Sequence, residues 1–197
     1  MKITPMKRLL FALIGLFTAL SFSSCGYNTM VSKDENVKAK WAQVENAYQR
    51  RADLIPNLVA TVKGAAQHEE STLTAVVEAR AKATSVTVNP DDLSEEAIAK
   101  FQQSQDALSQ SIGRLLVSVE AYPDLKANSN FQELQAQLEG TENRIAVERR
   151  AYNEAVQDYN TTVRSFPNNI IAGIFGFKPK GTFQAAAGSD KAPTVSF

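Results

Sequence analysis

The chain has 197 residues, of which 44% are hydrophobic and 21% are charged, a size and composition typical of one globular domain. It contains 21 Lys and Arg residues and 21 Asp and Glu residues, so its formal net charge is zero. This balance gives no indication of a nucleic-acid-binding protein, and we expect no nucleic acid among its partners.

A secretory leader is predicted at the start of the chain. Three basic residues precede an apolar run from Leu9 to Phe22, and small residues and the only cysteine, Cys25, follow it. This order is typical of a signal peptide. We therefore predict a lipoprotein-type signal peptide at residues 1–24, cleaved before Cys25, which then carries palmitate or a similar acyl chain. The alternative is an incidental cysteine behind an ordinary signal or a short anchor.

The predicted membrane anchor is the lipid on Cys25. The apolar run has 14 residues, fewer than the roughly 20 that a membrane-spanning helix needs. After cleavage the chain would contain 18 Lys and Arg against 21 Asp and Glu residues, a net charge of −3, so it would lack a polybasic surface. We expect the mature protein in the cell envelope, outside the cytoplasm, on either the inner or the outer membrane.

The mature chain begins with a long amphipathic helix, predicted at about residues 31–66. Apolar residues recur along it at steps of three and four. They are Val37, Trp41, Val44, Tyr48, Ile55, Leu58, Val62 and Ala65. Pro56 lies inside this pattern, and the pattern continues in phase beyond it. We therefore expect a bend at residues 52–56 and not a helix end.

Three further helices are predicted, at about residues 69–84, 94–122 and 130–166. Residues 64–70 are either a turn or a bend within one longer helix, and we favour a break. Four helices with short connections and single apolar stripes are typical of a bundle. The sequence thus predicts an all-α fold, an antiparallel up-and-down four-helix bundle of residues 25–167 with long first and last helices.

Two segments follow the predicted bundle. Residues 168–183 form an apolar extension that includes the glycine-containing stretch from Ile170 to Phe177. This stretch is too short to span a membrane. It either folds back over one end of the bundle, which we favour, or contacts a membrane or a partner. Residues 184–197 contain Ala, Gly, Ser and Pro and are predicted to be disordered.

The apolar stripes of the first and last helices each have one gap. The repeat places a core residue at position 51 and another at position 148, where the chain has Arg51 and Glu148. If the two helices are antiparallel, these residues lie at about the same level. We therefore predict a structural, buried Arg51–Glu148 ion pair that fixes helix register. The alternative is that both side chains reach outward from the edge of the stripe.

The groups that most catalytic sites need are missing from this sequence. There is one histidine, His68, and no zinc-protease, P-loop, dinucleotide-binding or nucleophile-elbow motif. The acidic pairs lie at helix starts and loops, where they favourably meet the helix dipole. We expect neither an enzyme nor a catalytic residue, and neither a metal nor a cofactor.

Several stretches of this chain resemble the LemA family. They are "YNTMV" (Tyr27 to Val31), "RRADLIPNLVATVKGAAQHE" (Arg50 to Glu69), "EARAKA" (Glu78 to Ala83), "LLVSVEAYPDLKANSNFQELQAQLEGTENRIAVERRAYNEAVQDYN" (Leu115 to Asn160) and "FP" (Phe166-Pro167). The resemblance implies a four-helix bundle with long helices, displayed outside the cytoplasm on a membrane anchor. Many members resemble proteins anchored by an N-terminal apolar helix, whereas this chain carries "SSCG". The resemblance implies no agreed biochemical activity.

The leading functional hypothesis is a non-enzymatic envelope lipoprotein that scaffolds or binds an unidentified envelope protein. Its candidate polar interaction residues are Arg50, Asp53, Asn57, Glu120, Asp124, Asn143 and Arg149. The competing interpretation of these residues is internal, as helix-pairing and turn-capping groups. An alternative function is a small-ligand or lipid-binding helical bundle that uses its core as a pocket.

Overall fold

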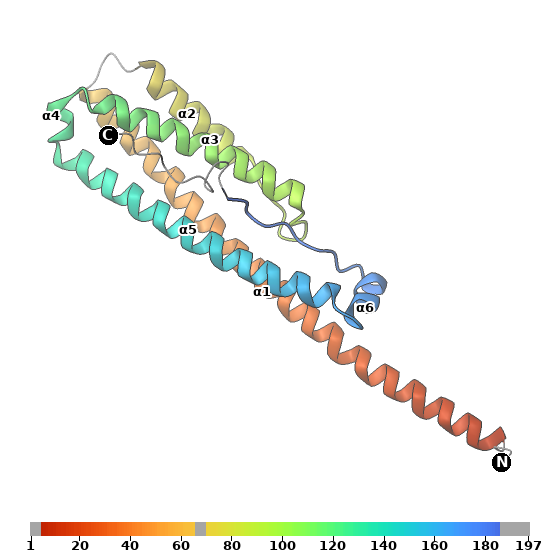
Figure 1. The fold of residues 1–197 in the computed structure, drawn as a ribbon. Helices are drawn as coiled ribbons and strands as arrows, with labels where there is room; N and C mark the ends of the chain where they lie inside the picture. Colours follow the sequence, from red (N-terminus) through yellow and green to blue (C-terminus); the bar gives the residue numbers. More distant parts are fainter. Residues whose placement is uncertain (1–4, 66–69, 186–197) are drawn as a thin grey trace, which may run out of the picture.

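The computed structural model describes residues 5–65 and 70–185, and of residues 5–25 and 65 the backbone alone. Its helices are α1 (Pro5–Ala65), α2 (Glu70–Ser85), α3 (Glu95–Val119), α4 (Pro123–Lys126), α5 (Ser129–Arg164) and α6 (Asn168–Phe175), shown in Figure 1. Every regular element among the described residues is a helix, which confirms the predicted all-α class. The sequence predicts four of these helices and misses the short α4 and α6.

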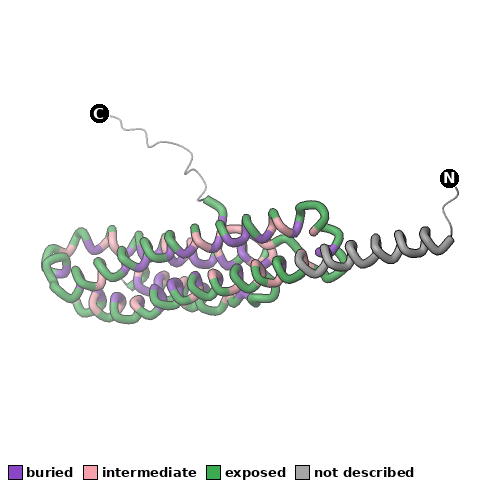
Figure 2. The backbone as a smooth tube through the Cα atoms, turned by 90° about the horizontal axis from the view of Figure 1, so that it is seen from below, coloured by how far each residue is buried: buried purple, intermediate pink, exposed green. Residues whose placement is uncertain are grey.

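The four long helices lie lengthwise against one another, and successive ones run in opposite directions (Figure 1). α1 packs along α5, α2 packs along α3, and α1 also contacts α2. α4 lies at one end of this body, and α6 packs against α1 and α5 at the other end. Buried residues follow the inner faces of the helices along the body (Figure 2).

Several helix boundaries differ from the prediction. α1 begins at Pro5 and not near residue 31. α3 ends at Val119, and Pro123 opens α4, because proline suits the first turn of a helix, where its missing N–H is not needed. α5 begins one residue earlier and ends two residues earlier than predicted, and Asn128 caps its start.

Some predictions concern parts of the chain outside the described residues. α1 ends at Ala65 and α2 begins at Glu70, but the connection at 66–69, which contains His68, lies outside them. The same holds for residues 186–197 of the predicted tail and for the side chain of Cys25. Cleavage of residues 1–24 and lipidation of Cys25 therefore stay predictions.

Pro56 lies within α1, as the sequence predicts. Proline has no N–H, so the carbonyl of Ala52, four residues earlier, lacks its usual helical donor. Arg80 of α2 supplies the missing bond, because its Nε donates to that carbonyl at 2.7 Å. The proline thus creates an acceptor on α1 that fixes the position of α2.

The core consists of two hydrophobic clusters separated by a polar layer. The cluster on the α6 side is rich in aromatic residues, which are Trp41, Tyr48, Phe101, Tyr152, Tyr159 and Phe183. The cluster on the α4 side is mainly aliphatic and includes Ile55, Leu58, Val62, Leu108, Leu115 and Leu138. On α1, Arg51 lies between the two clusters, and on α3 the buried Gln105 occupies the same position.

Candidate interaction site

Arg51 forms the centre of the polar layer, with 1% of its surface exposed. Its Nη1 donates to Ser109 Oγ at 2.5 Å and to Glu142 Oε1 at 2.7 Å. Its Nη2 donates to the side-chain oxygen of Gln105 at 2.6 Å and to the backbone carbonyl of the same residue at 3.2 Å. One side chain of α1 is therefore bonded to both α3 and α5.

The predicted Arg51–Glu148 ion pair is wrong in its partners. Both residues are buried, as the gaps in the apolar stripes predict. However, Arg51 pairs with Glu142, and Glu148 pairs with Arg144 of its own helix at 2.7 Å. A second bridge, Lys33 to Asp158 at 2.5 Å, marks the register of α1 against α5. Residues at similar distances from this bridge lie at about the same level of the two helices. Position 51 is 18 residues from Lys33 along α1, and position 142 is 16 residues from Asp158 back along α5. Glu148 lies six residues away, about 9 Å along the helix.

The polar layer is suited to holding helices in register. A buried guanidinium stays charged, and here it donates to four oxygen acceptors that offset its loss of water. Such a group specifies which level of one helix meets which level of the next. The cluster around Arg51 therefore has a structural role.

A second polar arrangement holds the C-terminal segment, which we define as residues 178–185, against α5. Asn153 and Asn160 of α5 each form a pair of bonds with the backbone of one residue. The Asn160 side chain accepts from the Lys180 N–H at 2.8 Å and donates to its carbonyl at 2.9 Å. The Asn153 side chain does the same for Phe183, at 2.9 and 3.0 Å.

The spacing of these two asparagines matches an extended peptide. Seven residues of helix from Asn153 to Asn160 span about 10.5 Å. Three residues of extended chain, from Lys180 to Phe183, span about 10 Å. Gln102 of α3 adds a third pair of bonds, both at 3.0 Å, with the backbone of Gln184. The side-chain amides thus bind the segment through its backbone, as the edge of a sheet would.

Phe183 anchors the C-terminal segment in the aromatic cluster. Its ring lies 5.5 Å from that of Tyr152 and 6.0 Å from that of Trp41, and the Arg149 guanidinium lies over it at 4.7 Å. Gly181 lies so close to α3 that a Cβ there would come within 2.5 Å of the backbone of Glu95. The position accepts only glycine without movement of the segment.

Ion pairs attach the start of this segment to the rest of the body. Lys180 pairs with Asp34 of α1 at 2.9 Å, Asp34 also pairs with Lys38 at 3.2 Å, and Lys38 pairs with Asp91 of the α2–α3 loop at 2.7 Å. The hydrogen bond from Lys38 holds the pKa of the Asp91 carboxyl below its ordinary value. Burial raises the pKa of Tyr159, beside Lys180, to about 12. Burial likewise raises the pKa of Tyr152, whose hydroxyl donates to the Gly181 carbonyl at 3.0 Å.

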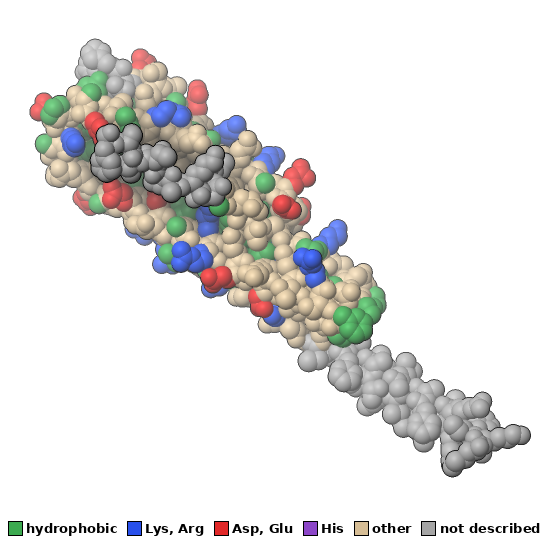
Figure 3. Space-filling model, in the orientation of Figure 1, with side chains coloured by type: hydrophobic (Ala, Val, Ile, Leu, Met, Phe, Trp, Pro, Cys, Tyr) green, Lys and Arg blue, Asp and Glu red, His purple; other side chains and the backbone are tan. Residues whose placement is uncertain are grey.

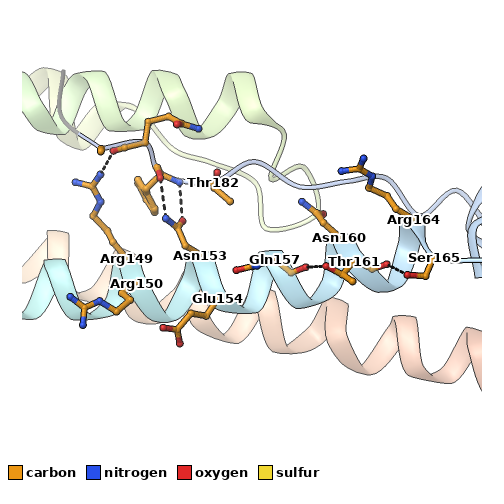
Figure 4. Close-up of a pocket in the computed structure, with 13 residues that line it drawn as sticks. Arg149, Arg150, Asn153, Glu154, Gln157, Asn160, Thr161, Arg164, Ser165 and Thr182 are labelled. Atoms are coloured by element: carbon orange, nitrogen blue, oxygen red, sulfur yellow. Dashed lines mark hydrogen bonds between the residues drawn. The ribbon is translucent and has the colours of Figure 1, made fainter. Parts of the chain in front are cut away.

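Beside the segment lies an open cavity of about 1100 Å³, which we call the α5 groove. Its lining residues come from α5, the turn after it and the C-terminal segment. They are Arg149, Arg150, Asn153, Glu154, Gln157, Asn160, Thr161, Arg164, Ser165, Thr182, Phe183, Gln184 and Ala185. Figure 4 shows Arg149, Asn153 and Asn160 reaching from α5 toward the segment. Three arginines against one glutamate make the groove positively charged.

The comparison with protein families is decisive for this chain. The LemA family profile matches residues 40–197, which include the polar layer and the α5 groove. The chain belongs to the LemA family. This finding confirms the resemblance stated from the sequence motifs.

Three curated relatives show how far the similarity extends. The chain is 29% identical to magnetosome protein MamQ 2 of Paramagnetospirillum magneticum, over 83% of this chain and 66% of that protein. It is 26% identical to MamQ of Magnetospirillum gryphiswaldense, over 77% of this chain and 62% of that protein. It is 22% identical to protein LemA of Metamycoplasma hominis, over 88% and 74%. The chain therefore spans slightly less than two thirds of the length of these MamQ proteins.

In this LemA-family chain the candidate polar residues do not form one surface. Arg149 lies at the α5 groove, and Arg50 lines a shallow cavity between α1 and α5. Glu120 and Asp124 lie at the α3–α4 corner, and Asp53, Asn57 and Asn143 are exposed elsewhere on α1 and α5. Of the seven, Arg149 alone among the described contacts reaches the C-terminal segment.

The aromatic residues that could have lined a ligand pocket are part of the packed core. Trp41 contacts Phe101, Tyr152 and Phe183, with ring centroids 5.1 to 6.0 Å apart. The large cavities found in the described part of the chain open at the surface. The core geometry therefore does not favour the alternative of a lipid-binding bundle.

Sequence reasoning misses the residues that hold the C-terminal segment. Asn153, Asn160 and Gln102 do not interrupt any apolar stripe, so periodicity gives no reason to select them. The available signal is the spacing of seven residues between two asparagines, which places both on the same side of a helix. Gly181, Phe183 and Gln184 fall at the boundary between the predicted apolar extension and the predicted tail.

Among the described residues, no group of three or more His, Cys, Asp and Glu side chains is placed to hold a metal ion. Within the same residues, no helix has an apolar stretch long enough to cross a bilayer.

Proposed function

We propose that this LemA-family chain is a membrane-anchored envelope protein that binds a protein partner through the α5 groove and has no enzymatic activity. In this proposal the long helices act as an antiparallel four-helix bundle, a rigid scaffold that presents the groove outside the cytoplasm. The anchor is the lipid on Cys25 after removal of residues 1–24.

The observation that supports this proposal is the way α5 holds the C-terminal segment. Asn153 and Asn160 hold an extended stretch of the chain's own backbone along α5, so their amides are occupied and a partner would use the neighbouring polar side chains of the groove. The groove beside the segment is open and has further polar side chains on α5. An extended partner segment can therefore lie along α5, next to the chain's own.

The charge of the groove defines the chemistry of the partner. Arg150 and Arg164 are exposed and take part in no ion pair among the described contacts, and Glu154 is the single acidic residue in the lining. Arginine side chains bind carboxylates through paired hydrogen bonds. We therefore propose an acidic, extended segment of an envelope protein as the ligand of this site.

Site-specific crosslinking in cells tests the partner. A photoreactive residue at Gln157, inside the groove, is compared with one at Glu139, an exposed position on the same helix outside it. We expect one discrete crosslinked protein from position 157 and none from position 139. Equal or absent crosslinking at both positions would contradict the proposed site.

A separate experiment tests the anchor. A metabolic acyl label should enter the native chain and not Cys25→Ser, and the variant should leave the membrane fraction. A native chain without label would refute lipidation. An unlabelled chain that stays in the membrane fraction would instead favour the short apolar anchor.

A further inference from the structure

α6 and the turn before it carry an exposed apolar surface that the proposed partner groove does not use. The side chains of Phe166, Ile170, Ile174 and Phe175 are 80%, 56%, 73% and 61% exposed. Ile171 and Ala172, on the opposite side of α6, are buried against the aromatic cluster. The helix is therefore apolar on two sides, one packed in the core and the other exposed to solvent. The sequence predicts Phe166 as the end of the last helix, whereas α5 ends at Arg164 and Phe166 is exposed.

These residues gather at one end of the molecule. Five of the eight large hydrophobic residues exposed in the described chain lie there, the four above and Tyr27 of α1. The Tyr27 ring contacts those of Phe175 and Phe177 at 4.8 and 5.7 Å. Figure 3 shows hydrophobic side chains grouped at the end that carries α6. Clustering at one end is a property of interaction surfaces and not of scattered surface residues.

The sequence around α6 fits a phospholipid interface. From Ser165 to Phe177 there is no charged residue, and Arg164 and Lys178 stand at either side. Amphipathic helices that lie on a bilayer have an apolar face with Phe or Leu and basic residues near the headgroups. A protein partner of the acidic type proposed for the α5 groove would find no ionic contact within this stretch.

The position of α6 along α1 places its exposed apolar surface beside the predicted membrane anchor. A Cβ on Gly26 would lie 2.7 Å from Asn168 Oδ1 and 3.1 Å from Ile171 Cδ1, so α6 packs directly on α1 at that residue. Gly26 follows Cys25 and lies four residues after the apolar run that ends at Phe22. Four residues of helix span about 6 Å. An anchor at either place therefore brings α6 to the surface of the membrane.

We propose that α6 is a second membrane contact, which lies in the plane of the phospholipid interface with Phe166, Ile170, Ile174 and Phe175 among the upper acyl chains. This inference rests on the proposed membrane anchoring. The N-terminal anchor and α6 then form two points of attachment on one rigid body. Together they restrict its tilt relative to the bilayer and with it the direction in which the α5 groove faces.

Fluorescence of the full chain in vesicles tests this contact. The chain is reconstituted in phosphatidylcholine–phosphatidylglycerol vesicles, with or without brominated acyl chains, as Phe175→Trp and as the control Val117→Trp. Val117 is 68% exposed and lies near the end of α3 at the α4 side of the body. The unsubstituted chain, with Trp41 alone, gives the background. We expect both variants to float with the vesicles. Brominated lipid should quench the emission from position 175 at least twofold and leave that from position 117 unchanged.

The outcomes separate the contact from the anchor. Flotation of both variants without quenching at position 175 would refute the α6 contact and leave the anchor intact. Failure to float would refute both. A blue shift at position 175 without vesicles, rising with protein concentration, would assign the surface to a second copy and overturn the proposal. Adding Ile170→Ser and Ile174→Ser to Phe175→Trp should reduce the quenching, with circular dichroism confirming unchanged helix content.

Discussion

Replacing Arg51 should destabilise the protein and, through its energetic coupling to Glu142, report the register of α1 against α5. Arg51→Met keeps the apolar stem of the side chain and removes the guanidinium. The change leaves the side-chain oxygen of the buried Gln105 without its donor, which costs about 1–3 kcal/mol, while the Gln105 carbonyl keeps its donor within α3. Glu142 is 47% exposed at its side chain, so water can replace its lost partner. We therefore expect Arg51→Met to lower the free energy of unfolding by about 2 kcal/mol.

A double-mutant cycle tells the observed partner from the one predicted by sequence. Arg51→Met is combined with Glu142→Gln in one cycle and with Glu148→Gln in the other. Directly bonded residues couple by about 0.5–3 kcal/mol, whereas residues without shared partners are additive within about 0.5 kcal/mol. We expect coupling above 1 kcal/mol with Glu142 and additivity with Glu148. Urea unfolding followed by Trp41 fluorescence and far-UV circular dichroism gives each free energy. Coupling to Glu148 that equals or exceeds coupling to Glu142 would refute the register.

Three other predictions follow from the same contacts. Arg80→Met should lower the free energy of unfolding by about 1–3 kcal/mol, because the Ala52 carbonyl loses its donor. The loss should be smaller in a Pro56→Ala background, where residue 56 again supplies a helical N–H. Equal losses in both backgrounds would contradict this explanation. Phe183→Ala should cost about 3 kcal/mol and raise amide exchange at positions 180–184, and unchanged exchange there would show that the aromatic anchor does not hold the segment. Burial raises the pKa of Tyr159 to about 12 from an ordinary value near 10, so its contribution to stability is complete below pH 10 and is lost as pH rises to 12. Urea titrations across this range should give a shallower fall in stability for Tyr159→Phe than for the native chain, and parallel curves would contradict the shift.

The helices and the buried charges of this chain could be predicted because both follow from periodicity. A three-four repeat identifies the buried side of a helix, and a charged residue in that repeat is a candidate for burial, as Arg51 and Glu148 are. The partner of Arg51 could not be predicted, because pairing depends on helix register and an error of two turns leaves the same stripes in contact. Predicting the bond from Arg80 to the Ala52 carbonyl likewise requires the position of α2 against α1, which the sequence does not give.

The path of the C-terminal segment and the place of α6 could not be predicted for a different reason. The segment is held by side-chain amides that bind backbone groups, and such contacts leave no pattern in the sequence of the bound peptide. α6 follows a helix that sequence reasoning extends to Phe166, whereas α5 ends at Arg164 and Phe166 is exposed. The apolar character of residues 170–177 was evident, but its division between core and solvent requires the fold.

In our proposal, the α5 groove is the surface at which a membrane-anchored LemA-family protein meets its partner. Crosslinking from Gln157 in cells, repeated with Arg150→Glu and Arg164→Glu together, tests this role of the groove. We predict one crosslinked envelope protein with the native groove and at least a tenfold loss with the charge reversal, while helix content and stability stay unchanged. An equally strong crosslink after charge reversal, or the same product from Glu139, would contradict the claim.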